Sequence, residues 1–233
     1  MALEQIDYSH DGVALTGWLA RPERAARGAI LILPTIVNHN AAMARRAQML
    51  ADAGFIAMVA DFYGEPVEDF AASRPLADNL RGNVDHYRAR LFAGLDALAA
   101  AAPGLTLSAI GYCMGGQAAL ELARAGAPLA LAASFHGILS SGRPATAETP
   151  IAARIYVAHG DADPMVPREQ VRAFWEEMDA AGANWHFHSY SGVKHGFTDP
   201  GSDGRGMDAI GYDASADRQS WLGLTGLLDE LYA

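Results

Sequence analysis

The only cysteine of this 233-residue chain, Cys113, stands in the hexapeptide GYCMGG at residues 111–116. An apolar run precedes it and an alanine- and leucine-rich stretch follows, which indicates a strand that turns sharply into a helix. Glycines two residues before and two after the cysteine avoid the clashes that such a turn imposes. The first turn of a helix favours a thiolate and an oxyanion alike. The pattern predicts a nucleophilic cysteine, against the alternative of a small packed residue in a glycine-rich turn.

A nucleophilic thiol needs a base, and the base needs a group that orients its ring. His195 in SGVKHGF (191–197) follows an apolar run and is the predicted base, which takes the thiol proton and later activates water. The predicted orienting carboxylate is Asp163 in HGDADPMVP (159–167), because G-x-x-D-x-x-V-P is the spacing of such loops. Asp161 is instead expected to bond its own backbone in a turn. The chain order of nucleophile, acid and histidine favours a catalytic triad.

Acyl transfer also needs two N–H donors that hold the oxyanion of the tetrahedral intermediate. One predicted donor is the backbone N–H of Met114, directly after the nucleophile. The second should come from the loop PTIVN (34–38), which follows the first long apolar run. We assign it to Ile36, with Thr35 and Val37 as alternatives because a one-residue offset cannot be resolved at this level.

Other histidines are given smaller roles. His39 and His136 each follow an apolar run, so both are expected to lie near the substrate. His186 and His188 alternate along one predicted strand and therefore share a face. No third ligand stands near them in the sequence, so we interpret them as a structural pair and predict no metal site.

Short apolar runs and helical patterns alternate along the chain. Residues 3–22 predict a hairpin that turns at Asp11-Gly12. The six apolar runs expected to form strands are 28–33, 55–60, 105–110, 129–135, 154–158 and 185–190. Helical patterns cover roughly 40–53, 82–101, 114–125, 168–181 and 214–232. This alternation predicts an α/β fold with a doubly wound, mostly parallel sheet flanked by helices on both faces.

Residues 1–233 show no repeat, linker or low-complexity tract. The sequence therefore predicts a single α/β domain over residues 1–233. The segment 63–81 is the least regular inner stretch, and it could border the site or be a plain surface connection. In a doubly wound sheet, ligands bind beyond the carboxyl ends of the strands. The predicted functional residues all follow strands, so we expect them to meet at that edge.

Composition narrows the range of partners. The formal net charge is -10, which disfavours nucleic acid and anionic membrane surfaces and favours a small-molecule substrate. A single cysteine allows no disulfide within the chain. The N-terminus shows no signal-peptide pattern, and no apolar run is long enough to span a membrane. We expect a cytoplasmic protein that is a monomer or a homodimer.

These motifs together resemble the dienelactone hydrolase family, whose members have the α/β-hydrolase fold. The resemblance covers nearly the whole chain and includes GYCMGG around Cys113, HGDADPMVP around Asp163, KHGF at His195 and ADFYG at residues 60–64. It also includes a C-terminal helix after residues 212–213. The resemblance implies a cysteine, histidine and aspartate triad that hydrolyses esters or lactones without a metal or organic cofactor.

Two residues depart from the pattern of the family's best-known members. Those members carry a glutamate that contacts the resting thiol, and the matching position here is Thr35, so thiol activation must differ or His195 must act directly. They also carry an arginine shortly after the catalytic histidine, which holds a substrate carboxylate. Here the sequence continues as GFTD, and Asp199 would repel an anion. Arg81 is the remaining candidate for an anion contact.

The predicted activity is therefore hydrolysis of a carboxylic ester or lactone of a small molecule through a thioester on Cys113. A thioesterase or another acyl-transfer enzyme would use the same parts and stays an alternative. A second alternative is a catalytically silent module that binds a small molecule, which the intact triad disfavours.

Overall fold

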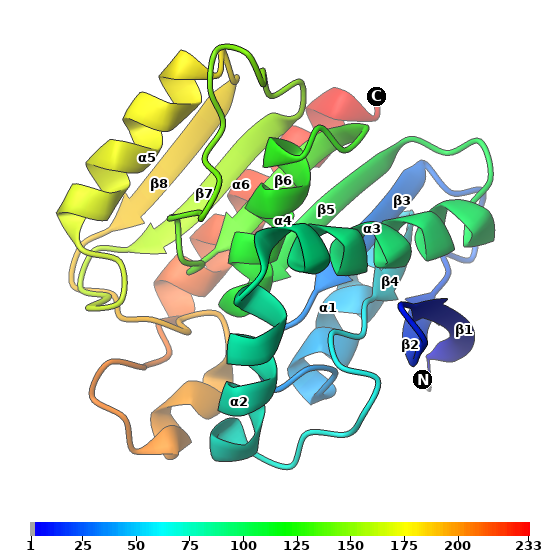
Figure 1. Cartoon of the computed structure of the whole chain (residues 1–233), viewed down its shortest axis with the longest axis horizontal. Coiled ribbons are helices and arrows are strands. Elements are labelled where there is room, and N and C mark those ends of the chain that lie inside the picture. The colour runs from blue at the N-terminus through cyan, green and yellow to red at the C-terminus, as the bar shows by residue number, and fades with distance from the viewer. Residues whose placement is uncertain (1–2) are drawn as a thin grey trace.

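Eight strands form one sheet among residues 3–233, the part of the chain that the computed structural model describes (Figure 1). The strands are β1 Glu4–His10, β2 Val13–Ala20, β3 Gly28–Leu33, β4 Phe55–Val59, β5 Leu107–Tyr112, β6 Leu129–Phe135, β7 Arg154–Gly160 and β8 Trp185–Tyr190. Their order across the sheet is β1-β2-β4-β3-β5-β6-β7-β8. Strand β3 thus lies between β4 and β5, near the centre of the sheet.

The first two strands form the hairpin that the sequence predicts. Strands β1 and β2 pair antiparallel, and the turn places Asp11 at φ 51° and Gly12 at φ 76°. Both positive values fit the two-residue turn that Asp-Gly favours. Strand β2 also pairs antiparallel with β4, while the pairs from β4 to β8 are parallel. The mostly parallel sheet expected from the apolar runs is confirmed.

Helices connect the parallel strands. They are α1 Ala41–Asp52, α2 Phe70–Arg81, α3 Val84–Ala101, α4 Met114–Arg124, α5 Arg168–Ala180 and α6 Ala214–Leu231, with a 3₁₀ helix η1 at Pro200–Arg205. Four helices begin after a side chain that accepts hydrogen bonds from first-turn N–H groups, namely Asn40, Asp69, Asn83 and Asp213. These caps satisfy backbone donors that have no partner within the helix.

The sheet is covered on both faces, as its unbroken apolar strands require. Helices α3, α4 and α5 lie on one face, and α1 and α6 lie on the other (Figure 1). Side chains alternate along β3 between these two layers. Leu31 and Leu33 belong to the core under α3 and α4, whereas Ile30 and Ile32 belong to the core over α1 and α6. The central strands are thereby buried and rigidly held.

Strand β5 differs from its prediction by two residues. The sequence places this strand at 105–110, ending before Gly111, but it runs from Leu107 to Tyr112. A glycine after an apolar run predicts the end of a strand, yet Gly111 pairs with Ser134 in the parallel ladder. The strand therefore continues to the residue directly before the cysteine.

The segment 63–81 is more ordered than its sequence suggests. Its second half forms α2, a twelve-residue helix that contains Pro75 and is capped by Asp69. Proline inside a helix removes one hydrogen bond, so the sequence favoured an irregular stretch. The short helix η1 is likewise absent from the sequence prediction. Figure 1 shows α2 and η1 beside each other, beyond the ends toward which the parallel strands point.

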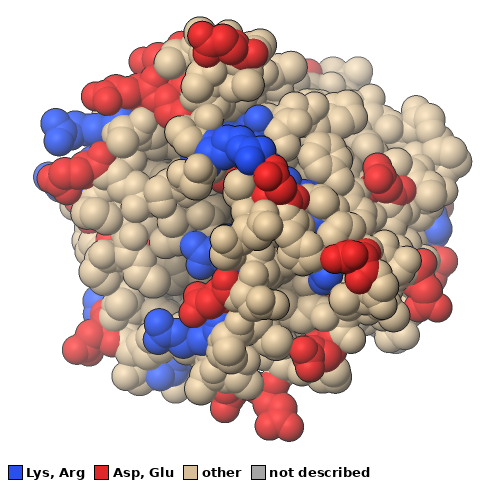
Figure 2. Space-filling model, viewed as in Figure 1, with Lys and Arg blue, Asp and Glu red and all other residues tan. Residues whose placement is uncertain are grey.

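Charged side chains are dispersed over the surface. On the face drawn in Figure 2, acidic and basic residues intermingle and wide uncharged areas separate them. Within residues 3–233, no helix is both long enough and apolar enough to span a bilayer.

Candidate active site

Cys113 occupies the single position between a strand and a helix. Strand β5 ends at the preceding residue and α4 begins at the next. The cysteine has φ 56° and ψ −118°, a left-handed conformation that side chains other than glycine rarely adopt. A Cβ on Gly111 would lie 1.8 Å from the carbonyl oxygen of Gly115, so the two glycines permit the close crossing of the backbone. This is the strand-to-helix turn expected from GYCMGG.

His195 and Asp163 meet at the carboxyl ends of β7 and β8. Nδ1 of His195 lies 2.7 Å from Oδ2 of Asp163, and both side chains are buried. Oδ1 of Asp163 accepts the backbone N–H of Met165 at 2.9 Å, which fixes the carboxylate. The other ring nitrogen of His195, Nε2, is buried. The ring interacts with the Cys113 thiol as well as with Asp163.

Cys113 and His195 line one cavity and change each other's ionisation. Burial raises the pKa of the Cys113 thiol, but the neighbouring His195 cation lowers it, and the net shift is downward. Burial lowers the pKa of His195, whereas the Cys113 thiolate and the bond to Asp163 raise it, to about 10. The pair therefore favours a thiolate beside an imidazolium, which is the reactive form of a cysteine nucleophile.

Two backbone donors converge on the sulfur. The N–H groups of Met114 and Ile36 both lower the pKa of the Cys113 thiol by interacting with it. The first donor lies at the N-terminus of α4, and the second lies in a turn after β3 that the bond from the Asn38 N–H to the Thr35 carbonyl closes at 2.9 Å. A carbonyl oxygen bound beside the sulfur would meet the same two donors.

His136 contacts the backbone of the turn that carries Cys113. Its Nδ1 accepts the backbone N–H of Cys113 at 3.2 Å, and its Nε2 lies 2.9 Å from Oγ1 of Thr198. Nδ1 must therefore be unprotonated, and burial accordingly holds the pKa of His136 well below its ordinary value. The ring joins the turn at Cys113 to the loop that carries His195, in addition to lining the cavity.

A cavity of about 560 Å³ opens over the sulfur, a size typical of small-molecule sites. Two residues singled out in the sequence line it: Thr35, an alternative oxyanion donor, and Arg81, the candidate anion contact. Its outer wall comes from α2, which contributes Arg74 and Arg81, and from residues 196–210, which include η1. Three exposed apolar side chains stand at this wall: Phe70, Met165 and Met207. Apart from Met165, which lies in the loop after β7, the wall is thus built from the two segments that the sequence did not resolve as helices.

Several sequence candidates lie elsewhere. His39 does not reach the cavity, because its ring stacks on Trp18 with centroids 4.2 Å apart. Asp161 pairs with Arg168 at the surface rather than with the histidine. His186 and His188 make separate contacts, with Arg154 and Tyr156. Among residues 3–233, no group of three or more histidine, cysteine or acidic side chains is arranged to hold a metal ion.

Some cavity residues carried no recognisable signal in the sequence. Arg205 lies ten residues after His195, and it pairs with Asp199 at 2.5 Å within the cavity wall. The sequence suggested that Asp199 would repel an anion, but this pairing offsets its charge. Outside the cavity, Asn38 in the turn that carries the second donor bonds Asp61, and Tyr63 bonds the carbonyl of Ile36. Both stand in quoted segments, PTIVN and ADFYG, but the sequence assigned neither side chain a role.

Solved structures of similar shape show which class of protein this is. A dienelactone hydrolase-like promiscuous phosphotriesterase from metagenomic libraries is 33% identical, with a TM-score of 0.91 over 99% of both chains. A structure from Coxiella burnetii, described as an alpha-beta serine hydrolase homologue, is 18% identical, with a TM-score of 0.67 over 97% of this chain and 98% of that one. The second likeness concerns the fold alone. The protein has the α/β-hydrolase fold.

The family follows from the sequence match. The dienelactone hydrolase family matches residues 15–232, and the chain belongs to that family. A probable 2-oxo-3-(5-oxofuran-2-ylidene)propanoate lactonase of Bradyrhizobium sp is 26% identical over 213 residues, or 84% of each protein. An uncharacterised Caenorhabditis elegans protein is 38% identical over 128 residues, which span 54% of this chain and 81% of that protein. The chain is a hydrolytic enzyme that acts on esters or lactones.

Proposed function

We propose that the enzyme cleaves its ester or lactone through a thioester on Cys113, with His195 as base and Asp163 as the group that orients the ring. The observation that carries this proposal is the placement of Cys113, at the strained turn between β5 and α4, in one cavity with His195, whose Nδ1 lies 2.7 Å from Asp163. The His195 cation and the N–H groups of Ile36 and Met114 support it, since each lowers the pKa of the Cys113 thiol. A packed structural cysteine needs neither a neighbouring cation nor two aligned donors. An acyl-transfer nucleophile needs both.

Acylation begins with attack of the Cys113 thiolate on the carbonyl carbon. The carbonyl electron pair moves onto oxygen, and the resulting oxyanion accepts hydrogen bonds from the N–H groups of Ile36 and Met114. When the intermediate collapses, the bond between carbon and the leaving oxygen breaks, and that oxygen takes the proton from Nε2 of His195. The products of this step are an alcohol and a thioester. In a lactone the alcohol stays attached to the acyl group, because the broken bond belongs to a ring.

Deacylation reverses these roles. Neutral His195 takes a proton from water at Nε2 while the water oxygen attacks the thioester carbon. Asp163 holds Nδ1 in its protonated tautomer through the 2.7 Å bond and stabilises the cation that forms. Collapse of the second oxyanion breaks the bond between carbon and sulfur. It releases the carboxylic acid and restores the thiolate beside the imidazolium.

The cavity supports a small substrate with an apolar portion and a polar or anionic substituent. Ile138 and Met207 present apolar surface, while Arg74 and Arg81 stand on one side of α2. Thr35 lines the cavity and is a further proposed contact for the substrate. Arg81 is the proposed contact for an anionic substituent. A small-molecule partner, a monomeric or dimeric state and a cytoplasmic location stay predictions.

The decisive experiment uses Cys113→Ala and a short aryl ester. Turnover should fall to the background rate, because no other side chain is proposed to attack the carbonyl. Rapid acid quenching of the wild-type reaction, followed by peptide mass spectrometry, should detect the acyl group on the peptide that contains Cys113. His186→Gln, a change on β8 that faces away from the cavity, serves as the matched control and should retain full activity.

Retained turnover in Cys113→Ala would refute the nucleophile. Full turnover in the absence of any acyl-cysteine would instead indicate that the thiolate acts as a base on water. A parallel panel of lactones, aryl esters and acyl thioesters, with neutral and anionic acyl groups, ranks the substrate classes. Preference for thioesters would favour the alternative of a thioesterase.

A further inference from the structure

The turn that carries the second oxyanion donor contains an unusual buried asparagine. Asn38 has φ 62°, in the left-handed region where glycine is the ordinary choice, and it is buried. Its backbone N–H closes the turn by bonding the carbonyl of Thr35. Glycine would meet the backbone requirement alone, so the contacts of the asparagine side chain need an explanation of their own.

The Asn38 side chain fastens the turn to the end of a central strand. Its Nδ2 donates to Oδ1 of Asp61 at 2.8 Å, and its Oδ1 accepts the backbone N–H of Phe62 at 3.1 Å. The same Asp61 oxygen also accepts the N–H groups of Tyr63 and Gly64, both at 2.9 Å. Asp61 lies two residues after the end of β4 and is buried, so the sheet holds it in place. The asparagine is therefore anchored at both of its polar atoms.

A second contact holds the donor residue itself. The hydroxyl of Tyr63 donates to the carbonyl oxygen of Ile36 at 3.0 Å, and the tyrosine is buried against the core. Ile36 is thus restrained through its carbonyl, and the turn is restrained through Asn38, two residues later. Met114 needs no such support, because its N–H is directed by the first turn of α4. The two donors differ in how their orientation is maintained.

We propose that Asn38 and Tyr63 are positioning residues that direct the N–H of Ile36 toward the oxyanion. This inference rests on the proposed thioester mechanism, since it concerns the transition state of that reaction. Neither side chain lines the cavity, so neither is expected to contact substrate. Their effect should appear mainly in the rate of acyl transfer. The ionisation of the thiol should change much less, because the His195 cation lowers the pKa of Cys113 more than the Ile36 N–H does.

The test compares two reactions of the same sulfur in Asn38→Gly. Ester hydrolysis passes through an oxyanion, whereas alkylation of Cys113 by iodoacetamide displaces iodide at a saturated carbon and forms none. Glycine adopts φ 62° freely, so the change removes the side-chain contacts while it keeps the backbone allowed. Removing a whole oxyanion donor costs about 100- to 1000-fold in kcat, so a misdirected donor should lower kcat by roughly 10- to 100-fold. The alkylation rate should stay within about twofold of wild type.

Asp11→Gly provides the matched control, because it also replaces a residue of positive φ by glycine. Asp11 lies in the hairpin turn outside the cavity. It should leave both reactions unchanged. Tyr63→Phe deletes the hydroxyl that bonds the carbonyl of Ile36 and that also contacts Sδ of Met114 at 3.5 Å, and it should lower kcat by several-fold with little change in KM. If circular dichroism shows that Asn38→Gly does not fold, Tyr63→Phe alone tests the positioning role.

Two outcomes would overturn the inference. Ester turnover within twofold of wild type in every folded variant would show that the donor needs no anchoring. Equal losses of hydrolysis and alkylation would show that the residues act on the thiol or on the whole site. These results differ from failure of the proposed mechanism, which Cys113→Ala reports separately through its own turnover. If that variant is inactive and both positioning variants are fully active, only the positioning role is excluded.

Discussion

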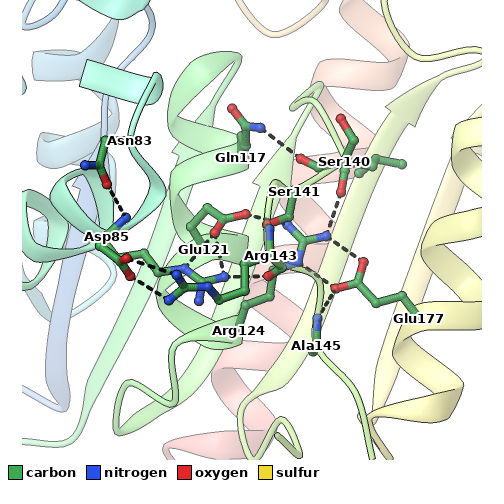
Figure 3. A network of polar contacts seen from close by, with 12 residues as sticks. Asn83, Asp85, Gln117, Glu121, Arg124, Ser140, Ser141, Arg143, Ala145 and Glu177 are labelled. Carbon is green, nitrogen blue, oxygen red and sulfur yellow. Dashed lines mark hydrogen bonds and ion pairs between the residues drawn. The ribbon is translucent and has the colours of Figure 1, made fainter. Parts of the chain in front are cut away.

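Two buried polar networks lie at opposite ends of α4, and they differ in how completely their polar groups are paired. In the first, Arg124 bonds Glu121 at 3.0 Å and Glu177 at 2.7 Å (Figure 3). Arg88 bonds the other oxygen of Glu121 at 2.8 Å. The remaining Arg124 nitrogen donates to the carbonyl of Leu139 at 2.6 Å. The second network runs from Asp163 through His195 to Cys113.

The first network has all its charges paired, whereas the second contains polar atoms without partners among the described residues. Two guanidinium and two carboxylate groups balance in the first network, and its contacts join α3, α4, α5 and the loop after β6. Every charge there faces a fixed partner. In the second network, Nε2 of His195 and Oγ1 of Thr35 are buried without hydrogen-bond partners among residues 3–233. Unsatisfied buried polar atoms are costly, so their presence beside Cys113 is consistent with the proposed role of this network in catalysis.

The strongest way to break the second network is Asp163→Asn. The amide cannot stabilise the His195 cation and permits the wrong tautomer, so kcat/KM should fall by about 1000- to 10,000-fold. Steady-state assays with an aryl ester measure this effect, and circular dichroism checks the fold. Activity within tenfold of wild type would contradict the orienting role, whereas Asp161→Asn is the matched change in the same loop and should be nearly silent.

The first network should respond in stability rather than in rate. Arg124→Met leaves the carboxylates of Glu121 and Glu177 facing each other without their shared partner. Losing one partner of a buried ion pair typically lowers the free energy of unfolding by about 3–5 kcal/mol. Urea denaturation measures the loss, and kcat of the folded enzyme should be unchanged at low temperature. Adding Glu177→Met should recover part of it, and a wild-type midpoint in Arg124→Met would mean that the network contributes little.

A pH series sharpens the comparison further. Alkylation of Cys113 should rise with pH at a midpoint below that of a free thiol, about 8.5, because His195 lowers the pKa of the sulfur. In His195→Gln the midpoint should move upward, since the largest cause that opposes burial is lost and only the N–H groups of Met114 and Ile36 still lower the pKa of the thiol.

The same variant tests the stability of the folded state. The pKa of His195 is raised to about 10, so its protonation stabilises the folded state fully below about 6.5 and progressively less as pH rises through 10. Denaturation of the two proteins should therefore diverge at low pH and converge above pH 10; a constant difference would contradict this linkage.

The smallest effect is expected at the edge of the first network. Arg143 and Asp85 form a bidentate ion pair at 2.5 and 2.9 Å, but both side chains are exposed. Water and salt screen such pairs, so Arg143→Ala should leave the denaturation midpoint and kcat unchanged within error. A clear drop in the midpoint would show that the exposed pair is coupled to the buried charges behind it.

The sequence predicted the sheet well where burial alone decides the structure. Strands β3 and β6 begin and end at the predicted residues, because two-sided burial demands unbroken apolar runs that turn residues delimit. Strand β8 also has the predicted bounds, although it lies at the edge of the sheet and is only partly buried. Prediction failed where long-range contacts override a local signal. Pro75 suggested a break, yet Ala77 and Leu80 bury the inner side of α2 in the core. That burial compensates for the hydrogen bond that the proline lacks.

The candidate site was predictable in its chemistry and less so in its surroundings. Cys113, Asp163 and His195 each follow a strand end, so one topological rule brings them to a single edge. The cavity wall depends instead on how connections between strands fold over that edge. His39 illustrates the limit, because the neighbouring Trp18, rather than its own loop, determines where the ring lies.

The outer wall of the cavity has an evolutionary consequence. Both segments that build it, α2 and the stretch around η1, are connections outside the sheet, whereas the proposed reacting groups are held by the strand ends. Connections tolerate insertion and replacement far better than buried strands do. Descendants of this scaffold could therefore acquire new substrates by exchanging two surface segments, each independently of the other, while inheriting an unaltered reaction centre.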